Sequence, residues 1–242
     1  MKTFAQTIVG EIVAKNYATA MIFTKYGIDF CCKGSQTIET ACQKNNVDVM
    51  LLQKDIEEFL KVQTCDQVQY NQSPLDELVD LVQNKHHKYI YDVTPIIQGY
   101  LAKICKVHGN NHPELFTVTK LFNQIIENLM PHMQKEETEF FPYVKDLAIA
   151  LKNNTKLGST PFGKIRDMIP ILMAEHVPEG ERMQQINELT NNYTPPKDAC
   201  NTYKATYASL QSFEQDLHLH IHLENNIIFK RALEDENKVQ FE

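Results

Sequence analysis

Four long segments with apolar residues three and four positions apart constrain the fold of this chain more than any other feature. They cover residues 75–107, 114–150, 162–190 and 199–234, and short polar stretches separate them. Apolar residues at this spacing line one side of an α-helix. The chain has only 8 glycines among 242 residues, so little interrupts these helices. Four long helices with short connections predict an antiparallel four-helix bundle in a nearly all-α protein.

A smaller helical unit is expected ahead of the bundle. Short helices are predicted at about 7–15, 17–26, 36–44 and 47–61. The polar stretch KVQTCDQVQYNQSP lacks helical periodicity and ends in Ser73-Pro74, a pair typical of a helix start. We therefore expect an N-terminal domain over 1–60, a linker over 61–73 and the bundle over 74–242.

Composition excludes some classes of partner. The formal net charge is -7 and no basic stripe stands out, which argues against nucleic acid. No apolar run approaches the roughly 20 residues that span a bilayer, and the first 21 residues lack a signal-peptide core. We therefore expect a cytoplasmic protein without a membrane partner. The six cysteines lack the regular spacing of a disulfide or zinc framework, so reduced thiols are expected.

Two of the long helices carry a histidine and a glutamate one turn apart on their apolar side. His132 and Glu136 lie in the stripe of 114–150, and His220 and Glu224 lie in the stripe of 199–234. Residues four apart on a helix share a face. Each pair is therefore expected to point into the core, where an unpartnered carboxylate is costly.

The sequence DLHLHIHLENN around His220 has two interpretations. Strict alternation of histidine and aliphatic residues is typical of a strand with three histidines on one face. The apolar residues from Leu210 to Ile228 instead predict a helix. In a helix, His218 and His222 turn about 200° away from His220 and leave the inward face. Only His220 is then expected in the core.

The other two helices each place one histidine inward. His176 replaces an apolar residue in the stripe of 162–190, whereas the pair His86-His87 interrupts the stripe of 75–107 and periodicity favours His86. One histidine per helix and two glutamates suit iron, with manganese or zinc as alternatives. A bundle without metal remains the plain alternative, because a lone core histidine is more often structural; the two histidine-glutamate pairs favour metal. His108, His112, His218 and His222 are expected at the surface or behind the ligands.

Cys31 and Cys32 form a separate candidate site. They precede a helix expected to begin near Ser35 or Gln36, and Lys33 is adjacent. A helix N-terminus and a cation lower the pKa of a thiol and make it reactive toward metals, NO or disulfides. The alternative is that one of the two cysteines is simply buried.

The sequence resembles the RIC family of iron-sulfur cluster repair proteins, also called YtfE or ScdA, over nearly the whole chain. The resemblance rests on KYGIDFCCKGSQT, PLDELVDLVQNKHHKY, HMQKEETEFFP, AEHVPEG, NNYTPPKDAC and HIHLENNIIFKRA. It implies a hemerythrin-like bundle with a carboxylate-bridged, non-haem centre of two iron ions. The ligands that it implies are His87, His132, Glu136, His176, His220 and Glu224. We follow it in choosing His87 over His86, since helices are often irregular near metal sites.

The resemblance also implies a function. It predicts repair of iron-sulfur clusters damaged by nitrosative or oxidative stress, by supply of iron, with a redox or iron-transfer role for Cys31 and Cys32. Glu175, next to His176, is expected behind a ligand or on the path of iron. The expected partners are damaged iron-sulfur proteins and small ligands such as NO or oxygen. A hemerythrin-like carrier of oxygen or NO, and a di-iron reductase of NO or nitrite, are the alternatives. The sequence leaves the oligomeric state open, a homodimer included.

Overall fold

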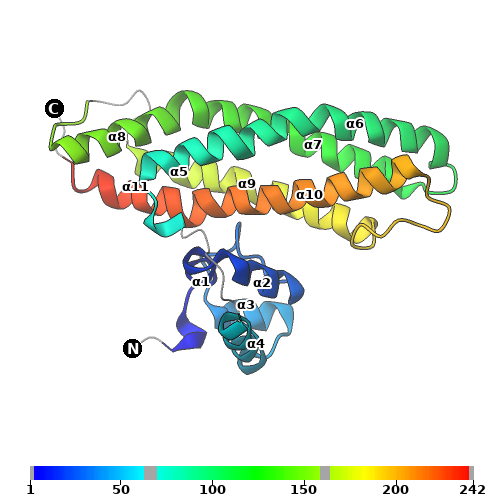
Figure 1. The fold of residues 1–242 in the computed structure, drawn as a ribbon, viewed down its shortest axis with the longest axis horizontal. Helices are drawn as coiled ribbons and strands as arrows, with labels where there is room; N and C mark the ends of the chain where they lie inside the picture. The colour runs from blue at the N-terminus through cyan, green and yellow to red at the C-terminus, as the bar shows by residue number, and fades with distance from the viewer. Residues whose placement is uncertain (1–2, 63–69, 159–163, 240–242) are drawn as a thin grey trace.

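The computed structural model describes residues 3–62, 70–158 and 164–239. These residues form helices and contain no β-strand, so the all-α prediction is confirmed for them. A small helical unit lies against one side of a long helical bundle (Figure 1). The predicted linker over 61–73 falls mainly on 63–69, outside the described residues. None of the described helices combines the length and apolar character needed to cross a bilayer.

The N-terminal unit consists of short helices close to their predicted positions. They are the 3₁₀ turns Phe4–Gln6 and Tyr17–Thr19 and the helices α1 (Val9–Lys15), α2 (Ala20–Lys25), α3 (Ile38–Asn45) and α4 (Val49–Val62). The Thr37 hydroxyl accepts a hydrogen bond from the Thr40 N–H, which caps α3. At its other end, Asn46 takes a left-handed conformation with φ of 53° and ends the helix. Helix α3 begins at Ile38, which is two or three residues later than predicted.

The bundle consists of four helical columns. They are α5 (Leu75–Leu81) continued by α6 (Lys88–His108), α7 (Glu114–Lys135) continued by α8 (Phe141–Asn153), α9 (Ile165–Leu189), and α10 (Asn201–Leu223) continued by α11 (Phe229–Glu236). Helix α6 packs against α7 and α10, and α9 packs against the same two, so the columns close into a ring (Figure 1). Their ends lie within a few residues of the predicted bounds.

Three of the four columns change from α-helix to π-helix near the middle of the bundle. The π segments are Val82–His87, Glu136–Phe140 and Glu224–Ile228. A π turn contains one residue more than an α turn and often marks a functional site. The segment Val82–His87 shows the irregularity that was expected near His87, whereas the apolar spacing gave no sign of the other two π segments.

The apolar core of the bundle forms two clusters. One contains Phe140, Leu147, Ile169 and Phe229, and the other contains Phe122 and Phe213, whose rings meet edge to face at 5.2 Å, along with the apolar residues of α6. Both clusters are almost fully buried. At roughly 25 cal/mol per Å² of apolar surface, this burial supplies the main stabilisation of the bundle.

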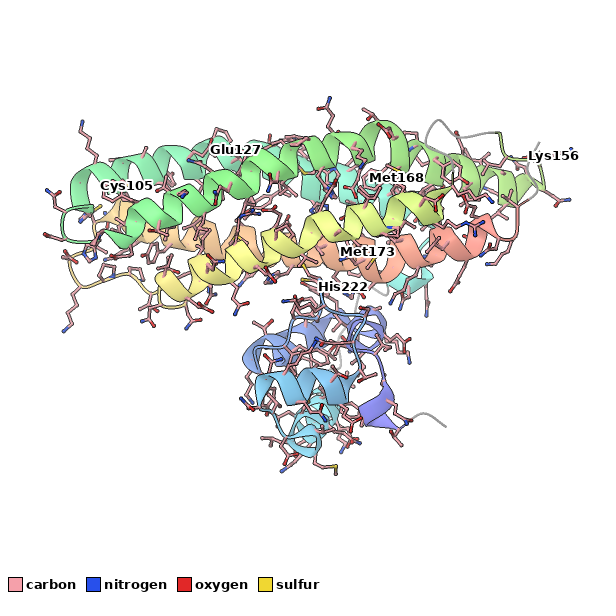
Figure 2. All side chains as sticks on the ribbon, turned by 180° about the vertical axis from the view of Figure 1, so that it is seen from behind. Cys105, Glu127, Lys156, Met168, Met173 and His222 are labelled. Atoms are coloured by element: carbon pink, nitrogen blue, oxygen red, sulfur yellow. The ribbon has the colours of Figure 1, made fainter. Side chains whose placement is uncertain are left out.

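The N-terminal unit packs on the bundle through the π segment Glu224–Ile228. The Asn226 side chain donates a hydrogen bond to the Phe30 carbonyl at 3.2 Å. A Cβ on Gly10 would collide with the Asn226 side-chain oxygen. Glycine at position 10 is therefore required for this close approach. His222, which faces the N-terminal unit (Figure 2), contacts the rings of Tyr17 and Phe30.

Candidate metal centre

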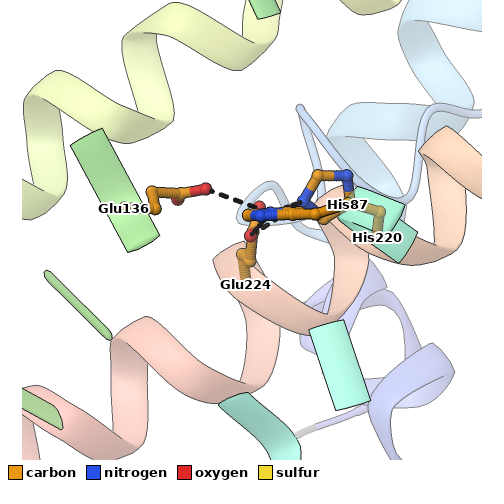
Figure 3. Close-up of side chains that lie close together, drawn as sticks. All are labelled: His87, Glu136, His220 and Glu224. Atoms are coloured by element: carbon orange, nitrogen blue, oxygen red, sulfur yellow. Dashed lines mark hydrogen bonds and ion pairs between the residues drawn. The ribbon is translucent and has the colours of Figure 1, made fainter. Parts of the chain in front are cut away.

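Two groups of buried side chains with metal-ligating atoms lie in the middle of the bundle. The first contains His87, Glu136, His220 and Glu224 (Figure 3), and the second contains His132, Glu136, His176 and Glu224. Within each group the ligand atoms lie within 4.8 Å of one another. The structure thus brings together all six side chains that the resemblance implies. We call these six residues the polar layer.

In the first group, two imidazole nitrogens face each other across a short gap. The Nε2 atoms of His87 and His220 are 3.1 Å apart, and the Nε2 of His220 lies 2.9 Å from Glu224 Oε1. Two nitrogens bound to one metal ion at about 2.1 Å and a right angle lie about 3.0 Å apart. The spacing of this pair therefore fits two ligands of one ion.

The second group repeats this arrangement. The Nε2 atoms of His132 and His176 are 2.8 Å apart, and His176 Nε2 lies 3.3 Å from Glu224 Oε2. Glu224 thus presents one oxygen to each histidine pair. Glu136 Oε2 lies 3.4 Å from His132 and 3.5 Å from His87. Each of the two carboxylates therefore lies next to both histidine pairs.

The buried carboxylate oxygens supply a test of whether a metal fits. Neither oxygen of Glu136 nor Oε2 of Glu224 makes a hydrogen bond, although both side chains are fully buried. These oxygens have only long contacts with the histidine nitrogens, at 3.3 to 3.5 Å. A buried carboxylate that lacks hydrogen bonds costs several kcal/mol. Cations between the histidine pairs would remove this cost, so the donor set fits a metal centre.

Hydrogen bonds behind the histidines fix which nitrogen faces inward. The Nδ1 atom of His87 lies 2.8 Å from Glu137, that of His132 lies 2.7 Å from Glu175, and that of His176 lies 3.0 Å from Asn225 Oδ1. An acceptor at Nδ1 holds the proton there and leaves the Nε2 lone pair free to bind metal. Glu175 therefore lies behind a candidate ligand, as one of the two predictions for it stated.

The π segment Val82–His87 resolves the choice between the two neighbouring histidines. Both His86 and His87 are fully buried, but only His87 belongs to the polar layer. His86 stacks on His220 and places its Nδ1 2.9 Å from Asp216. The periodicity of a regular helix favoured His86; the wider π turn brings His87 inward instead.

The ionisation of the metal-free layer reflects its crowded charges. Burial lowers the pKa of His87, but contacts with Glu136 and Glu224 outweigh burial and raise that pKa to about 10. Burial and the charge of Glu224 raise the pKa of Glu136. Burial lowers the pKa of His220 to about 4. Without metal, the layer therefore holds protons that a bound cation would displace.

The remaining histidines lie outside the polar layer, as predicted, but one is not at the surface. His222 is fully buried under the N-terminal unit, with its Nδ1 3.2 Å from Asn226. His218 contacts Phe30 ring to ring. His108 and His112 lie at the distant end of the bundle, next to Tyr203. Helix periodicity correctly predicted that His222 points away from the candidate ligands. It gave no information that the N-terminal unit covers this side chain.

The environment predicted for the cysteine pair is wrong in part. Cys31 is buried, and its hydrogen bond with Cys32, its burial and the charge of Asp29 raise its pKa well above the usual value. Lys33 lies instead 3.2 Å from Glu181 of the bundle. The Cys32 thiol lies 3.5 Å from the His176 carbonyl, so the pair sits directly beside a candidate ligand.

Asn225 is a residue at the site that sequence reasoning missed. Its oxygen faces His176 Nδ1, and its Nδ2 donates to the Cys31 carbonyl at 3.3 Å. One side chain therefore connects a candidate ligand to the cysteine loop. The sequence held a sign of this role: two polar asparagines directly follow Glu224 and precede three apolar residues, 227–229.

A surface pocket of about 750 Å³ reaches the polar layer from α7 and α9. Its lining includes Asn128, His132, Lys135, Glu175 and Glu179. Glu179 is buried and bonds Asn128 and Arg182 through one oxygen. The pocket therefore reaches a candidate ligand, His132, from the outside of the bundle.

Comparisons with known proteins agree with both parts of the chain. Residues 5–60 match the family ScdA_N, Domain of Unknown function (DUF542). Residues 82–232 match the family Hemerythrin, described as Hemerythrin HHE cation binding domain. The cation-binding domain and the buried histidine-glutamate groups together indicate a metal-binding protein.

Curated relatives match over nearly the full length of the chain. The iron-sulfur cluster repair protein ScdA of Staphylococcus haemolyticus is 33% identical over 93% of this chain and 97% of its own. That of Staphylococcus epidermidis is 28% identical over 94% and 98%. The iron-sulfur cluster repair protein YtfE of Yersinia pseudotuberculosis is 32% identical over 89% and 91%. The chain belongs to the ScdA/YtfE family of iron-sulfur cluster repair proteins.

Proposed function

We propose that the polar layer holds two iron ions and that the protein uses this centre to repair damaged iron-sulfur clusters. The observation that carries the proposal is the pair of ligand groups that share Glu136 and Glu224. One ion would be held by His87 and His220, the other by His132 and His176, and the two carboxylates would bridge them. This ligand set is the one implied by the resemblance.

The chemistry of the donors supports iron as the metal. Four imidazoles and two carboxylates form a set of intermediate hardness without a thiolate, which suits iron. Iron bound in this way supplies a redox-active ion that exchanges more readily than one in a closed thiolate cage. Six side chains do not fill the coordination spheres of two ions, so small ligands such as NO or oxygen have room to bind.

Iron supply is the route of repair that we propose. The names of the relatives state that they repair iron-sulfur clusters. In this chain, Glu175 contacts His132 at 2.7 Å and its side chain is 41% exposed in the surface pocket. An acidic residue that touches both a ligand and solvent offers a cation a path out. Cys31 and Cys32, next to His176, would transfer iron or electrons.

Metal content is the first test. Protein made with adequate iron should contain about two iron ions per chain, with the spectroscopic signature of a carboxylate-bridged pair. Fewer than about one iron per chain would contradict the di-iron centre.

Repair itself is tested by incubating the iron-loaded protein with an NO-damaged cluster enzyme. Recovered enzyme activity and iron lost from the repair protein are measured together, with metal-free protein as the control. We expect both to rise in proportion. Consumption of NO without recovered activity or iron transfer would favour the reductase, and reversible binding of NO or oxygen alone would favour the carrier.

A further inference from the structure

A third group of ligand atoms lies outside the polar layer, in the loop between α2 and α3. Asp29, Cys31 and Cys32 each offer one atom, and these atoms lie within 4.8 Å of one another. The loop points at the bundle (Figure 1), and the Cys32 thiol reaches the His176 carbonyl at 3.5 Å. We propose that these three side chains form a second metal site, for one divalent cation of the Fe(II) or Zn(II) class.

The distances fit a single tetrahedral ion. The two sulfur atoms are 3.9 Å apart, and two thiolates that bind one ion at about 2.3 Å lie about 3.8 Å apart. Asp29 Oδ1 is 3.4 Å from the Cys31 sulfur, and a carboxylate at about 2.1 Å would lie about 3.6 Å from the same thiolate. Binding requires only small movements of the side chains.

The loop is held in this shape by contacts on both sides. Asp29 Oδ1 accepts hydrogen bonds from the backbone N–H groups of Cys31 and Cys32 at 3.0 and 2.9 Å. On the bundle side, Asn225 donates to the Cys31 carbonyl, and Gly180 leaves room for the Cys32 sulfur. A preorganised site loses less conformational entropy when the ion binds.

Three protein ligands leave one position of a tetrahedral ion open. An open position suits an ion that is exchanged, whereas structural sites close all four positions. On binding, each thiol releases its proton to solvent and the thiolate forms the bond to the metal, with no change of oxidation state. The site shares no side chain with the polar layer but lies beside one of its ligands, His176.

This site deepens the proposed function and rests on it for iron as the native ion. Cobalt(II) tests the site directly, because a cysteine ligand produces thiolate-to-cobalt charge-transfer absorption and imidazole or carboxylate does not. Reduced full-length protein, already loaded with iron in the bundle, is titrated with cobalt. We expect the thiolate band to saturate at about one cobalt per chain.

Variants assign the band to its ligands. Cys31→Ser and Cys32→Ser should each abolish it or weaken cobalt binding at least about 100-fold. Asp29→Asn, which keeps an acceptor for the two backbone N–H groups, should weaken binding about tenfold or more. Cys42→Ser and Cys200→Ser are the matched controls and should leave the band unchanged.

The outcomes separate this proposal from the proposed function. If the bundle holds its iron but no thiolate band forms, the second site alone is overturned. The same holds if the band survives in Cys31→Ser. Unchanged binding in Asp29→Asn overturns the three-ligand site. A band lost in Cys200→Ser would place the cobalt at the other end of the molecule. Missing iron in the bundle with a normal thiolate band would instead contradict the di-iron centre.

Discussion

Within the part of the chain that the structure describes, two regions bring histidines and acids together, and the geometry of a metal centre is found in one of them. The polar layer collects its side chains from all four columns of the bundle. The second region, which we call the distal cluster, lies where α6 ends and α7 and α10 begin, and consists of His108, His112, Glu114, Asp198 and Cys200 (Figure 1). The polar layer is almost fully buried, whereas Asp198 and Cys200 are exposed.

The two regions differ in where the histidine nitrogens point. In the polar layer, Nε2 atoms of paired histidines face each other, and acceptors hold the Nδ1 atoms of His87, His132 and His176. In the distal cluster, both nitrogens of His112 are taken, one by Glu114 and the other by Asp198, each at 3.1 Å. His112 therefore has no nitrogen left for a metal. Residue types alone do not define a metal site; the direction of the free lone pairs does.

Glu136→Gln is expected to have the largest effect, because this carboxylate serves both histidine pairs. The variant keeps the shape of the side chain but loses the negative charge that would offset the two proposed cations. Iron affinity should fall on the order of 100-fold or more, measured as iron retained during a chelator challenge. Glu114→Gln removes a carboxylate that contacts His112 and should leave iron content unchanged. If both variants retained iron equally well, the conclusion that the polar layer binds metal and the distal cluster does not would be contradicted.

Asn225→Ala should have the next largest effect. It removes the acceptor that holds His176 Nδ1 and the donor to the Cys31 carbonyl. Such a loss typically costs about 10–100-fold in metal affinity. Asn226→Ala is the matched control: it removes the bonds to the Phe30 carbonyl and to His222 Nδ1, and neither partner is a candidate ligand. We expect faster proteolysis of the N-terminal domain in that control, but unchanged iron retention. Two variants with the same iron affinity would exclude a role of Asn225 at the metal.

Gly180→Ala should loosen the contact between the cysteine loop and the bundle. The added Cβ would lie 2.9 Å from the Cys32 sulfur, so the loop must move. Alkylation of Cys32, followed by mass spectrometry, should become several-fold faster. Gly99→Ala, an exposed helical position with open space around it, should instead stabilise the protein by about 0.5–1 kcal/mol. An unchanged alkylation rate at Cys32 would contradict the close packing.

The smallest expected effect is a difference in the rate of alkylation between exposed Cys200 and buried Cys31. Cys200 occupies the N-cap position of α10, where the Tyr203 N–H and then His108 lower its pKa to about 7. The pKa of Cys31 is instead raised well above the usual value. Since the thiolate reacts, alkylation of Cys200 should rise with pH and reach half its maximum near pH 7. Cys31 should stay unreactive there. His108→Gln should move the midpoint for Cys200 to higher pH, and an unmoved midpoint would rule out His108 as a cause.

Sequence periodicity predicted much of the fold and most of the polar layer. Long stripes of apolar residues located the four columns, and His132, Glu136, His176, His220 and Glu224 interrupt those stripes in a way that a regular helix explains. His87 came from the resemblance alone. A π turn has no clear signature in the sequence, so periodicity pointed one residue too early.

The remaining errors concern contacts between the two domains. His222 looked like a bystander because helix geometry describes only its own column, and nothing in that geometry shows that Tyr17 and Phe30 cover it. The same holds for Cys31. Its expected low pKa assumed a helix N-terminus within a few residues, but α3 begins at Ile38. The hydrogen bond with Cys32, burial and the charge of Asp29 raise the pKa of Cys31 instead.

The π segments also determine how related chains should be aligned. Each inserts one residue at the polar layer, so a relative without that insertion would differ by a one-residue gap there. Placing the gap elsewhere would pair His86 of this chain with the counterpart of His87, and would rotate every later position by about 100°. Single-residue deletions between Val82 and His87 should therefore harm the protein more than most substitutions at the same positions.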